Sequence, residues 1–328
     1  MQVGLEKIMV LGTGGTIAGT ATSAGDSRSY RAAQLPVGEL LAGLPLPPGC
    51  ELLSEQVAQI DSKDMDQAVW QALLQRCAYW LAQPGVRGLA ITHGSDTLEE
   101  TAFLLQAVLA PARPVVLTCA MRPADAPDAD GPRNLADALQ VAASPQARGV
   151  LTVCAGQIHG AVEVQKVHPT RLDAFASGAA GPLGLVGPGG VRWQRTSEPR
   201  ESAWSDAEIR ALTEMPVWPR VEILFSHALA CGAIVDAIVD PAAARSRGAL
   251  PVEGLVVAAT GNGTLHRALE DALRRAVAAG LQVRRATRCP QGVVLPGLRD
   301  EFPDSGGLSP VKARLALMLA LIRTRIAT

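Results

Sequence analysis

Short apolar runs that end in clusters of glycine, threonine and serine recur along this chain. The first run, 8–11, opens into the loop 12–20, in which four glycines are interleaved with three threonines. An apolar run of this length bounded by glycines predicts a buried strand. Because glycines permit a sharp turn and a close approach to the main chain, we expect a ligand at this loop.

Strand-like and helix-like patterns alternate through the first 193 residues. This alternation predicts the α/β class, with a parallel sheet covered by helices on both faces. In such a sheet the loops that follow the strands meet at one edge, where ligands bind. The expected strands are 51–60, 86–91, 115–118, 150–154 and 161–167, and the expected helices are 64–81, 98–109 and one that begins within 135–141.

A change of composition between residues 194 and 219 predicts a linker, because three prolines and two tryptophans lie there among charged residues. With 328 residues the chain is long enough for two domains. We expect a larger amino-terminal α/β domain at 1–193 and a smaller carboxyl-terminal α/β domain at 220–328. The smaller domain is predicted from strands at 221–225, 254–259 and 281–284 and helices at 265–279 and 311–326.

The glycine-rich loop fails both tests for a nucleotide site. A dinucleotide fingerprint that starts at position 12 requires glycine at position 17, where the chain has Ile17. A phosphate-binding loop that starts at position 14 requires lysine after its last glycine, where the chain has Thr20. What remains is a hydroxyl at the centre of the loop. Thr16 is therefore a candidate nucleophile, and a plain tight turn is the alternative.

Other polar turns admit a structural and a functional explanation. Tyr30 lies in the aperiodic segment 21–34, which we expect to be a surface loop, and the ring either anchors that loop or belongs to a lid. Ser62 or its neighbour Asp61 can cap the next helix. The polar turns 92–97 and 261–264 follow strands, so their side chains either cap helices or meet a ligand.

Composition favours a small ligand. The net charge is −1 and charged residues make up 19% of the chain, which gives no electrostatic preference for nucleic acid or for a membrane surface. The amino terminus lacks the pattern of a signal peptide, so we expect a cytoplasmic protein. The six cysteines form no C-x-x-C pair and the five histidines have no ligand spacing. We therefore expect reduced thiols, no metal and no cofactor.

Taken together, these loops resemble the bacterial L-asparaginase family, the threonine amidohydrolases that include glutaminase-asparaginases. The matching stretches follow the family's order and span most of the chain. They are Thr13–Gly19, Asp61–Met65, Ile91–Thr101, Ala120–Pro123, Asp130–Pro132, Lys166 and Gly261–Gly263.

The resemblance implies a homo-oligomer, built from intimate dimers that usually pair into tetramers, with active sites between subunits. It implies that Thr16 is the attacking hydroxyl, with Tyr30 on the lid beside it. Ser95, Asp96 and Lys166 would form a second catalytic cluster. The implied substrate-binding positions are Ser62 for the α-carboxylate, Asp96 for the α-ammonium, Ala120 through its main chain for the side-chain amide, Lys63 and Ser95, and Asn262 from a neighbouring subunit.

Amide hydrolysis requires that a proton leave the hydroxyl and that the oxyanion be stabilised. An acyl-enzyme on Thr16 that water hydrolyses is the simplest scheme, and direct attack by water stays open. Lys166 acts as a relay or as the base, although the neighbouring carboxylate of Asp96 favours its ammonium form.

Three positions depart from the family's pattern. Ser95 replaces the usual threonine, which keeps the oxygen but loses the methyl group that restricts the rotamer. Lys63 stands where many relatives carry Gln or Glu, and its cation would repel an α-ammonium unless it points outward or pairs with a nearby aspartate. The segment 293–309 has no clear match to the stretch in which many relatives supply an acidic residue to the neighbouring site, and Asp300 and Glu301 serve only as placeholders for it.

We therefore expect a cytoplasmic L-asparaginase that converts L-asparagine to L-aspartate and ammonia without a cofactor. A glutaminase-asparaginase with comparable glutamine hydrolysis is the close alternative, because the length of the pocket beyond Thr16 decides between the two substrates. A non-catalytic amino-acid or nucleotide sensor is a rival from another class. A subunit of a tRNA-dependent amidotransferase would require a basic patch or an RNA-binding region.

Overall fold

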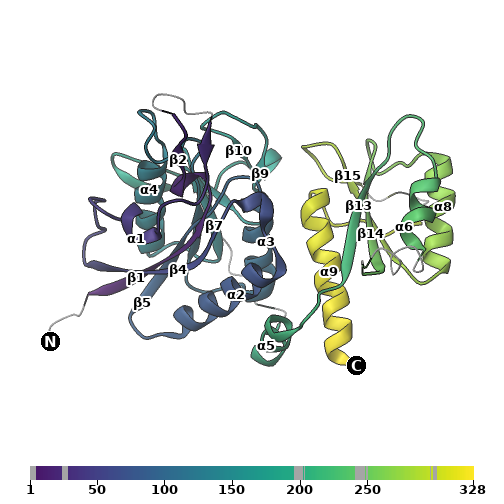
Figure 1. The fold of residues 1–328 in the computed structure, drawn as a ribbon, viewed down its shortest axis with the longest axis horizontal. Coiled ribbons are helices and arrows are strands. Elements are labelled where there is room, and N and C mark those ends of the chain that lie inside the picture. Colours follow the sequence, from purple (N-terminus) through teal and green to yellow (C-terminus); the bar gives the residue numbers. More distant parts are fainter. Residues whose placement is uncertain are drawn as a thin grey trace. The chain divides into compact units, whose positions relative to one another are not determined.

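The computed structural model describes residues 5–23, 29–195, 202, 204–240, 248, 250–295, 297 and 301–328. The chain divides after Glu214 into two compact units. Each unit has its own larger sheet, and Figure 1 shows the two sheets with the helices that cover them. The expected domains, 1–193 and 220–328, therefore fall in different units, and the expected linker 194–219 spans the division between them, although 196–201 and 203 lie outside the described residues.

The large sheet of the first unit has eight strands in the order β12-β11-β8-β7-β6-β5-β1-β4. The five strands from β4 to β7 are mutually parallel, as expected for an α/β protein. Their bounds are β1 (Glu6–Gly14), β4 (Cys50–Ile60), β5 (Val86–Thr92), β6 (Val115–Thr118) and β7 (Val150–Cys154).

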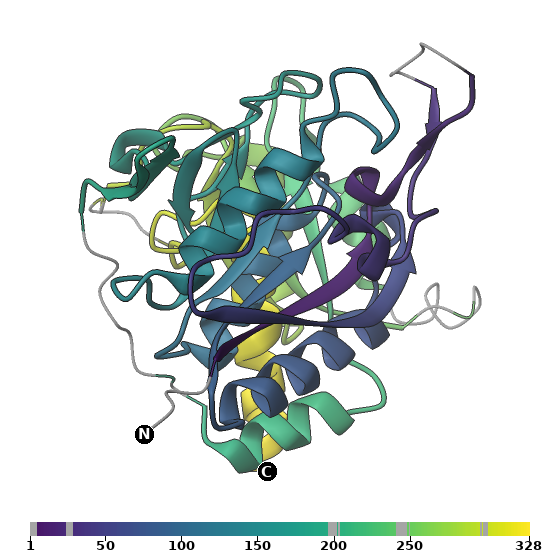
Figure 2. The same ribbon diagram turned by 90° about the vertical axis from the view of Figure 1, so that its left-hand side faces the viewer.

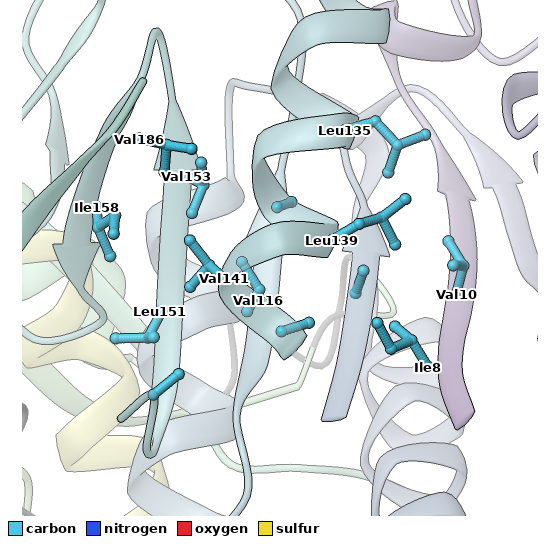
Figure 3. Packing of buried hydrophobic residues seen from close by; sticks show 14 of the residues in the cluster. Ile8, Val10, Val116, Leu135, Leu139, Val141, Leu151, Val153, Ile158 and Val186 are labelled. Atoms are coloured by element: carbon cyan, nitrogen blue, oxygen red, sulfur yellow. The ribbon is translucent and has the colours of Figure 1, made fainter. Parts of the chain in front are cut away.

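Helices cover both faces of this sheet (Figure 1). One face carries α1 (Val37–Leu40) and α4 (Gly131–Ala143), and the other carries α2 (Gln67–Ala82) and α3 (Leu98–Leu109). Figure 2 shows α4 lying across the parallel strands. In Figure 3, Leu135 and Leu139 of α4 point toward β1, and both side chains are buried in one apolar cluster with residues of the strands. Burial of this kind contributes about 1.5–3 kcal/mol for each large apolar side chain.

The strand order reverses at β1. From β1 the chain passes to β4 on one side and then returns to β5 on the other side. In open α/β sheets, ligands bind outside the carboxyl ends of the strands at such a switch point. The loops that follow β4, β1, β5 and β6 therefore surround the expected binding position.

The sheet beyond β7 is antiparallel, which corrects the expectation that strands and helices alternate throughout the first 193 residues. The segment 161–167 is not one strand, because β8 (Gln157–Gly160) precedes it and only β9 (Gln165–Lys166) falls within it. The physical reason is a tight turn, since Ala155 and Gly156 have positive φ angles of 49° and 73° and reverse the chain at once. The strands that follow β9 in the first unit are β10 (Phe175–Ala176), β11 (Gly184–Gly187) and β12 (Gly190–Trp193).

Two local expectations also require correction. The segment 21–34 was expected to be irregular, but β2 (Thr20–Ala21) and β3 (Tyr30–Arg31) form an antiparallel ribbon that projects from the first unit (Figure 2). The helix expected from residue 64 begins at Gln67, because Asp66 accepts a hydrogen bond from the Val69 N–H at 2.9 Å and caps α2. Asp61 instead precedes the short 3₁₀ turn Ser62–Asp64.

The expected linker contains α5 (Asp206–Glu214), which packs on α2 within the first unit. The second unit has a parallel sheet of β13 (Arg220–Phe225), β14 (Val252–Ala259) and β15 (Gln282–Thr287). Helix α9 (Pro310–Ala327) covers one face, while α8 (Arg267–Ala278) and α6 (Ala233–Val239), which was not expected, cover the other (Figure 1). In the described part of the chain, no helix has the length and apolarity to cross a membrane.

The six cysteines are free thiols. Four of them are buried, and Cys231 and Cys289 of the second unit are exposed. The buried four are Cys50, Cys77, Cys119 and Cys154.

Candidate active site

Four neighbouring parallel strands each deliver one of the expected site positions. Ser62 follows β4, Thr16 follows β1, Ser95 follows β5 and Ala120 follows β6. The strands end level with one another, because Gly12 pairs with Thr92 and Thr92 pairs with Thr118 in the sheet register. The sheet therefore brings together, at one edge, side chains that lie up to about a hundred positions apart in the sequence.

Thr16 begins a 3₁₀ turn directly after β1 and is buried. The preceding Gly14 and Gly15 have φ angles of 97° and 80°, which residues with a Cβ rarely adopt. A Cβ at Gly15 would lie 2.4 Å from the Cα of Gly94 in the loop after β5. The loop that carries Thr16 and the loop that carries Ser95 are therefore in direct backbone contact.

The Thr16 hydroxyl forms a hydrogen bond of 2.9 Å with the Tyr30 hydroxyl. Tyr30 lies on β3 of the projecting ribbon and is partly exposed. A second bond, from the Gln34 N–H to the carbonyl of Ala18 at 2.6 Å, joins the same two segments. Tyr30 is thus the one polar partner that the structure gives to the hydroxyl of Thr16 within the described residues.

Lys166 joins the two polar residues of the loop after β5. Its ammonium donates to the Ser95 hydroxyl at 2.8 Å and forms an ion pair with the Asp96 carboxylate at 2.6 Å. The Lys166 side chain is only 16% exposed, whereas Asp96 is 55% exposed. Because Ser95 accepts from the ammonium, its own hydroxyl hydrogen is left to donate elsewhere.

Ser62 lies under the same loop. Its hydroxyl oxygen accepts a hydrogen bond from the Asp96 N–H at 3.3 Å, and its carbonyl accepts from the Thr97 hydroxyl at 2.8 Å. A Cβ at Gly94 would lie 2.3 Å from the Ser62 oxygen, so glycine is required there for the two loops to pack. The structure therefore places Ser62 against Asp96.

Lys63 is not part of this cluster. Its ammonium pairs with Asp61 at 2.8 Å and with Asp64 at 3.1 Å, and the side chain is 61% exposed. The hydrogen bonds that its ammonium donates to these carboxylates raise the pKa of Lys63, and the bond to Asp61 has the larger effect. Of the arrangements considered for this lysine, pairing with its neighbouring aspartates is the one found.

Asn262 lies in the second unit, in the turn after β14. Its carboxamide donates to the Leu295 carbonyl at 3.3 Å and accepts from the Leu295 N–H at 2.6 Å. In the nearby segment, Asp300 lies outside the described residues, and Glu301 forms ion-paired hydrogen bonds with Arg274 of α8. The carboxylate of Glu301 is therefore engaged within its own unit.

A buried histidine supports the loop after β5, and sequence inspection assigned it no role. The ring of His93 is bonded at Nδ1 to the Gly94 carbonyl at 2.7 Å and at Nε2 to the Thr101 hydroxyl at 2.9 Å. Trp70 donates its indole N–H to the same hydroxyl at 2.9 Å. A carbonyl only accepts, so Nδ1 carries the hydrogen, and Nε2 accepts from Thr101. This chain of bonds holds Gly94, which contacts Gly15, in place.

The network requires a neutral His93. Burial lowers the pKa of its imidazole from 6.5 to about 4, although the bond to the Gly94 carbonyl acts in the opposite direction. His93 therefore binds a proton near pH 6.5 in the unfolded chain but remains neutral at that pH in the folded protein. Stability is full above pH 6.5 and falls as the pH decreases toward 4.

We expect protonation of His93 to lower the free energy of unfolding by about 2 kcal/mol between pH 7 and pH 5. Urea unfolding of the wild type and of His93→Gln at both pH values measures the difference, because the glutamine does not titrate. The variant should lose correspondingly less stability over this range. An equal loss in both proteins would contradict the assignment of a neutral, buried His93.

No group of three or more histidine, cysteine, aspartate or glutamate side chains that could hold a metal ion occurs among the residues that the structure describes. The polar groups at the sheet edge are instead hydroxyls, one ammonium and one carboxylate. Such a set suits the activation of a hydroxyl and the binding of a small zwitterion.

The fold and this edge define a class of protein: a two-unit α/β protein whose first sheet presents a buried threonine beside a lysine, serine and aspartate cluster. The chain belongs to the asparaginase family. Residues 7–199 match the family model described as "Asparaginase, N-terminal", and residues 220–327 match "Glutaminase/Asparaginase C-terminal domain".

Known proteins resemble the chain over nearly its full length. It is 34% identical to "Probable L-asparaginase periplasmic" of Haemophilus influenzae, covering 98% of this chain and 90% of the relative. It is 34% identical to "Glutaminase-asparaginase" of Pseudomonas fluorescens biotype A, covering 98% and 88%. The crystal structure of "Probable Cytoplasmic L-asparaginase" from Campylobacter jejuni superposes with a TM-score of 0.85 at 33% identity, covering 96% and 95%.

Proposed function

We propose that this protein hydrolyses the side-chain amide of L-asparagine to L-aspartate and ammonia, with Thr16 as the nucleophile. The observation that carries the proposal is the buried Thr16 hydroxyl, bonded to Tyr30 at 2.9 Å, on a loop that contacts the loop of Ser95 and Asp96. Membership of the asparaginase family supports the substrate class.

In this scheme the Thr16 oxygen bonds to the carbonyl carbon of the side chain. The hydroxyl proton leaves along the bond to Tyr30, whose own proton passes on to the amide nitrogen of the substrate. The C–N bond then breaks, and the nitrogen leaves as ammonia. Water hydrolyses the resulting ester and restores the Thr16 hydroxyl. Ser95, which accepts from the Lys166 ammonium, has a hydrogen to donate to the reacting group or to water.

The substrate is positioned by its two charged ends. Ser62 binds the α-carboxylate, Asp96 binds the α-ammonium, and the main chain at Ala120 holds the side-chain amide. Asn262 comes from a neighbouring subunit of a homo-oligomer in which two intimate dimers pair. The reaction needs no cofactor, and neither nucleic acid nor a membrane takes part.

The cytoplasm is the proposed compartment. A solved relative from Campylobacter jejuni carries the word cytoplasmic in its name, whereas the Haemophilus influenzae relative is named periplasmic. Fractionation of cells that express the native protein tests this assignment.

A glutaminase-asparaginase is the second candidate, because a relative of that name is 34% identical over nearly the whole chain. Ammonia release from the purified protein distinguishes the two. We expect kcat/KM for L-asparagine to exceed that for L-glutamine by about tenfold or more, as one methylene in a fitted pocket allows. Comparable values favour the second candidate. No ammonia from either amide would overturn the proposal and favour a sensor.

A further inference from the structure

Asp130 occupies the N-cap position of α4 but makes no capping hydrogen bond with its side chain. Aspartate at this position ordinarily accepts from the first free N–H groups of its own helix, which stabilises the helix by about 0.5–2 kcal/mol. Here the carboxylate accepts instead from the Met121 N–H, at 3.0 Å to each oxygen, and from the Arg122 N–H at 2.9 Å. The Asp130 side chain therefore does not cap α4 and instead binds the loop after β6.

Asn134, one helical turn further along, binds the same loop at another residue. Its amide nitrogen donates to the Cys119 carbonyl at 2.9 Å and to the Asp130 carboxylate at 3.1 Å. Its oxygen accepts from the Ala155 N–H at 3.0 Å. The residue is 2% exposed, so these bonds are shielded from water and fix the orientation of the carboxamide.

The two side chains bracket Ala120. Asn134 holds the carbonyl of the residue before it, and Asp130 holds the N–H of the residue after it. Gly131 brings the helix close enough, since a Cβ there would lie 3.4 Å from the Ala120 Cβ and 3.0 Å from Ile17, the neighbour of Thr16. The start of α4 thus contacts both the Ala120 loop and the Thr16 loop.

We propose that Asp130 and Asn134 are positioning residues that fix the main chain at Ala120 for recognition of the substrate's side-chain amide. The proposal rests on the proposed function, because it assigns these residues to the site that holds the amide. A carboxylate that accepts from two consecutive N–H groups forms charge-assisted bonds, which are about twice as strong as neutral ones. Loss of the charge would let the loop shift, and a shift of about 1 Å can cost 10²-fold in rate.

The test compares two substrates that differ only in the group leaving the carbonyl. L-Asparagine has an amide that donates hydrogen bonds to the main chain at Ala120, whereas the β-methyl ester of L-aspartate has no N–H to donate. Both present the same α-amino and α-carboxyl groups and the same carbonyl to Thr16. A defect in amide recognition lowers kcat/KM for asparagine alone, whereas a general structural defect lowers both.

For Asp130→Asn we expect kcat/KM for asparagine to fall about 30-fold, mostly through KM, and that for the ester to stay within about threefold. Asp128→Asn is the matched control, because Asp128 lies on the same loop but, within the described residues, its carboxylate pairs only with the Arg122 side chain, at 3.2 Å. The control should resemble the wild type on both substrates. Equal losses on amide and ester in Asp130→Asn would overturn the proposal.

Asn134→Ser provides a second variant in case Asp130→Asn does not fold. It keeps the bonds of Asp130 to Met121 and Arg122 but releases the Cys119 carbonyl, so we expect a smaller loss, about tenfold, again confined to asparagine. An unchanged ratio of amide to ester activity in this variant would also overturn the proposal. A wild type that hydrolyses neither substrate would refute the proposed function instead.

Discussion

Thr16→Ala is expected to lower kcat/KM for L-asparagine by about 10⁴-fold or more, with little change in thermal stability. Removal of a nucleophile leaves only binding and oxyanion stabilisation, which sustain a small residual rate. Thr16→Ser keeps the oxygen and should retain activity within about 100-fold, because only the rotamer restriction by the methyl group is lost. Ammonia release measured for the wild type and both variants, with thermal unfolding in parallel, checks the result.

Thr13→Ala is the matched control for this prediction. Thr13 is a buried threonine of the same loop, and its hydroxyl donates to the Thr92 carbonyl at 2.9 Å. Loss of that bond should destabilise the protein by about 1 kcal/mol and leave activity within about tenfold. Residual activity of Thr16→Ala close to that of Thr13→Ala would mean that another group attacks the amide.

The parallel half of the first sheet could be predicted because its strands are short apolar runs bounded by turn residues. The helix 98–109 and the strands 115–118 and 150–154 were expected with the bounds that the structure has. The two strands are wholly buried and the helix is buried at most of its apolar positions, so local hydrophobicity and tertiary environment agree. The family and the two-unit α/β fold are likewise confirmed.

The antiparallel half could not be predicted in the same way. Its strands are two to four residues long, which is too short for a period to be recognised. Ala155 adopts a positive φ, which is not expected for alanine, and this residue begins the turn that reverses the chain into β8. Tyr30 lies on a ribbon whose pairing depends on Thr20 and Ala21, nine residues or more away in sequence.

The sequence predicted that the candidate site residues lie in loops that follow strands. The contacts among them depend on which strands are neighbours, and the order around β1 is a property of the whole sheet. Support from His93, Asp130 and Asn134 was not predicted. Asp130 and Asn134 lie four residues apart, but the helix was expected to begin only within 135–141, whereas α4 begins at Gly131, so the sequence did not indicate that both residues face the same loop.

Lys166→Met is expected to lower kcat/KM for L-asparagine about 10³-fold. Methionine preserves the length and most of the packing of the side chain. It cannot donate to Ser95 or neutralise Asp96, whereas the lysine ammonium lies 2.8 Å from the Ser95 hydroxyl and 2.6 Å from the Asp96 carboxylate. Without that charge, Ser95 loses its fixed orientation, and Asp96 remains as an unpaired carboxylate beside the reacting group. Ammonia release from both proteins over a range of pH measures the loss.

Lys63→Met isolates what is specific to Lys166, because both lysines pair with aspartates at similar distances. They differ in environment, since Lys166 is 16% exposed and Lys63 is 61% exposed. An exposed pair is screened by solvent and contributes little. We therefore expect Lys63→Met to change kcat/KM by less than about threefold and to leave the unfolding midpoint nearly unchanged. If Lys63→Met instead raises KM for asparagine strongly, Lys63 belongs to the substrate-binding set that the family resemblance implied.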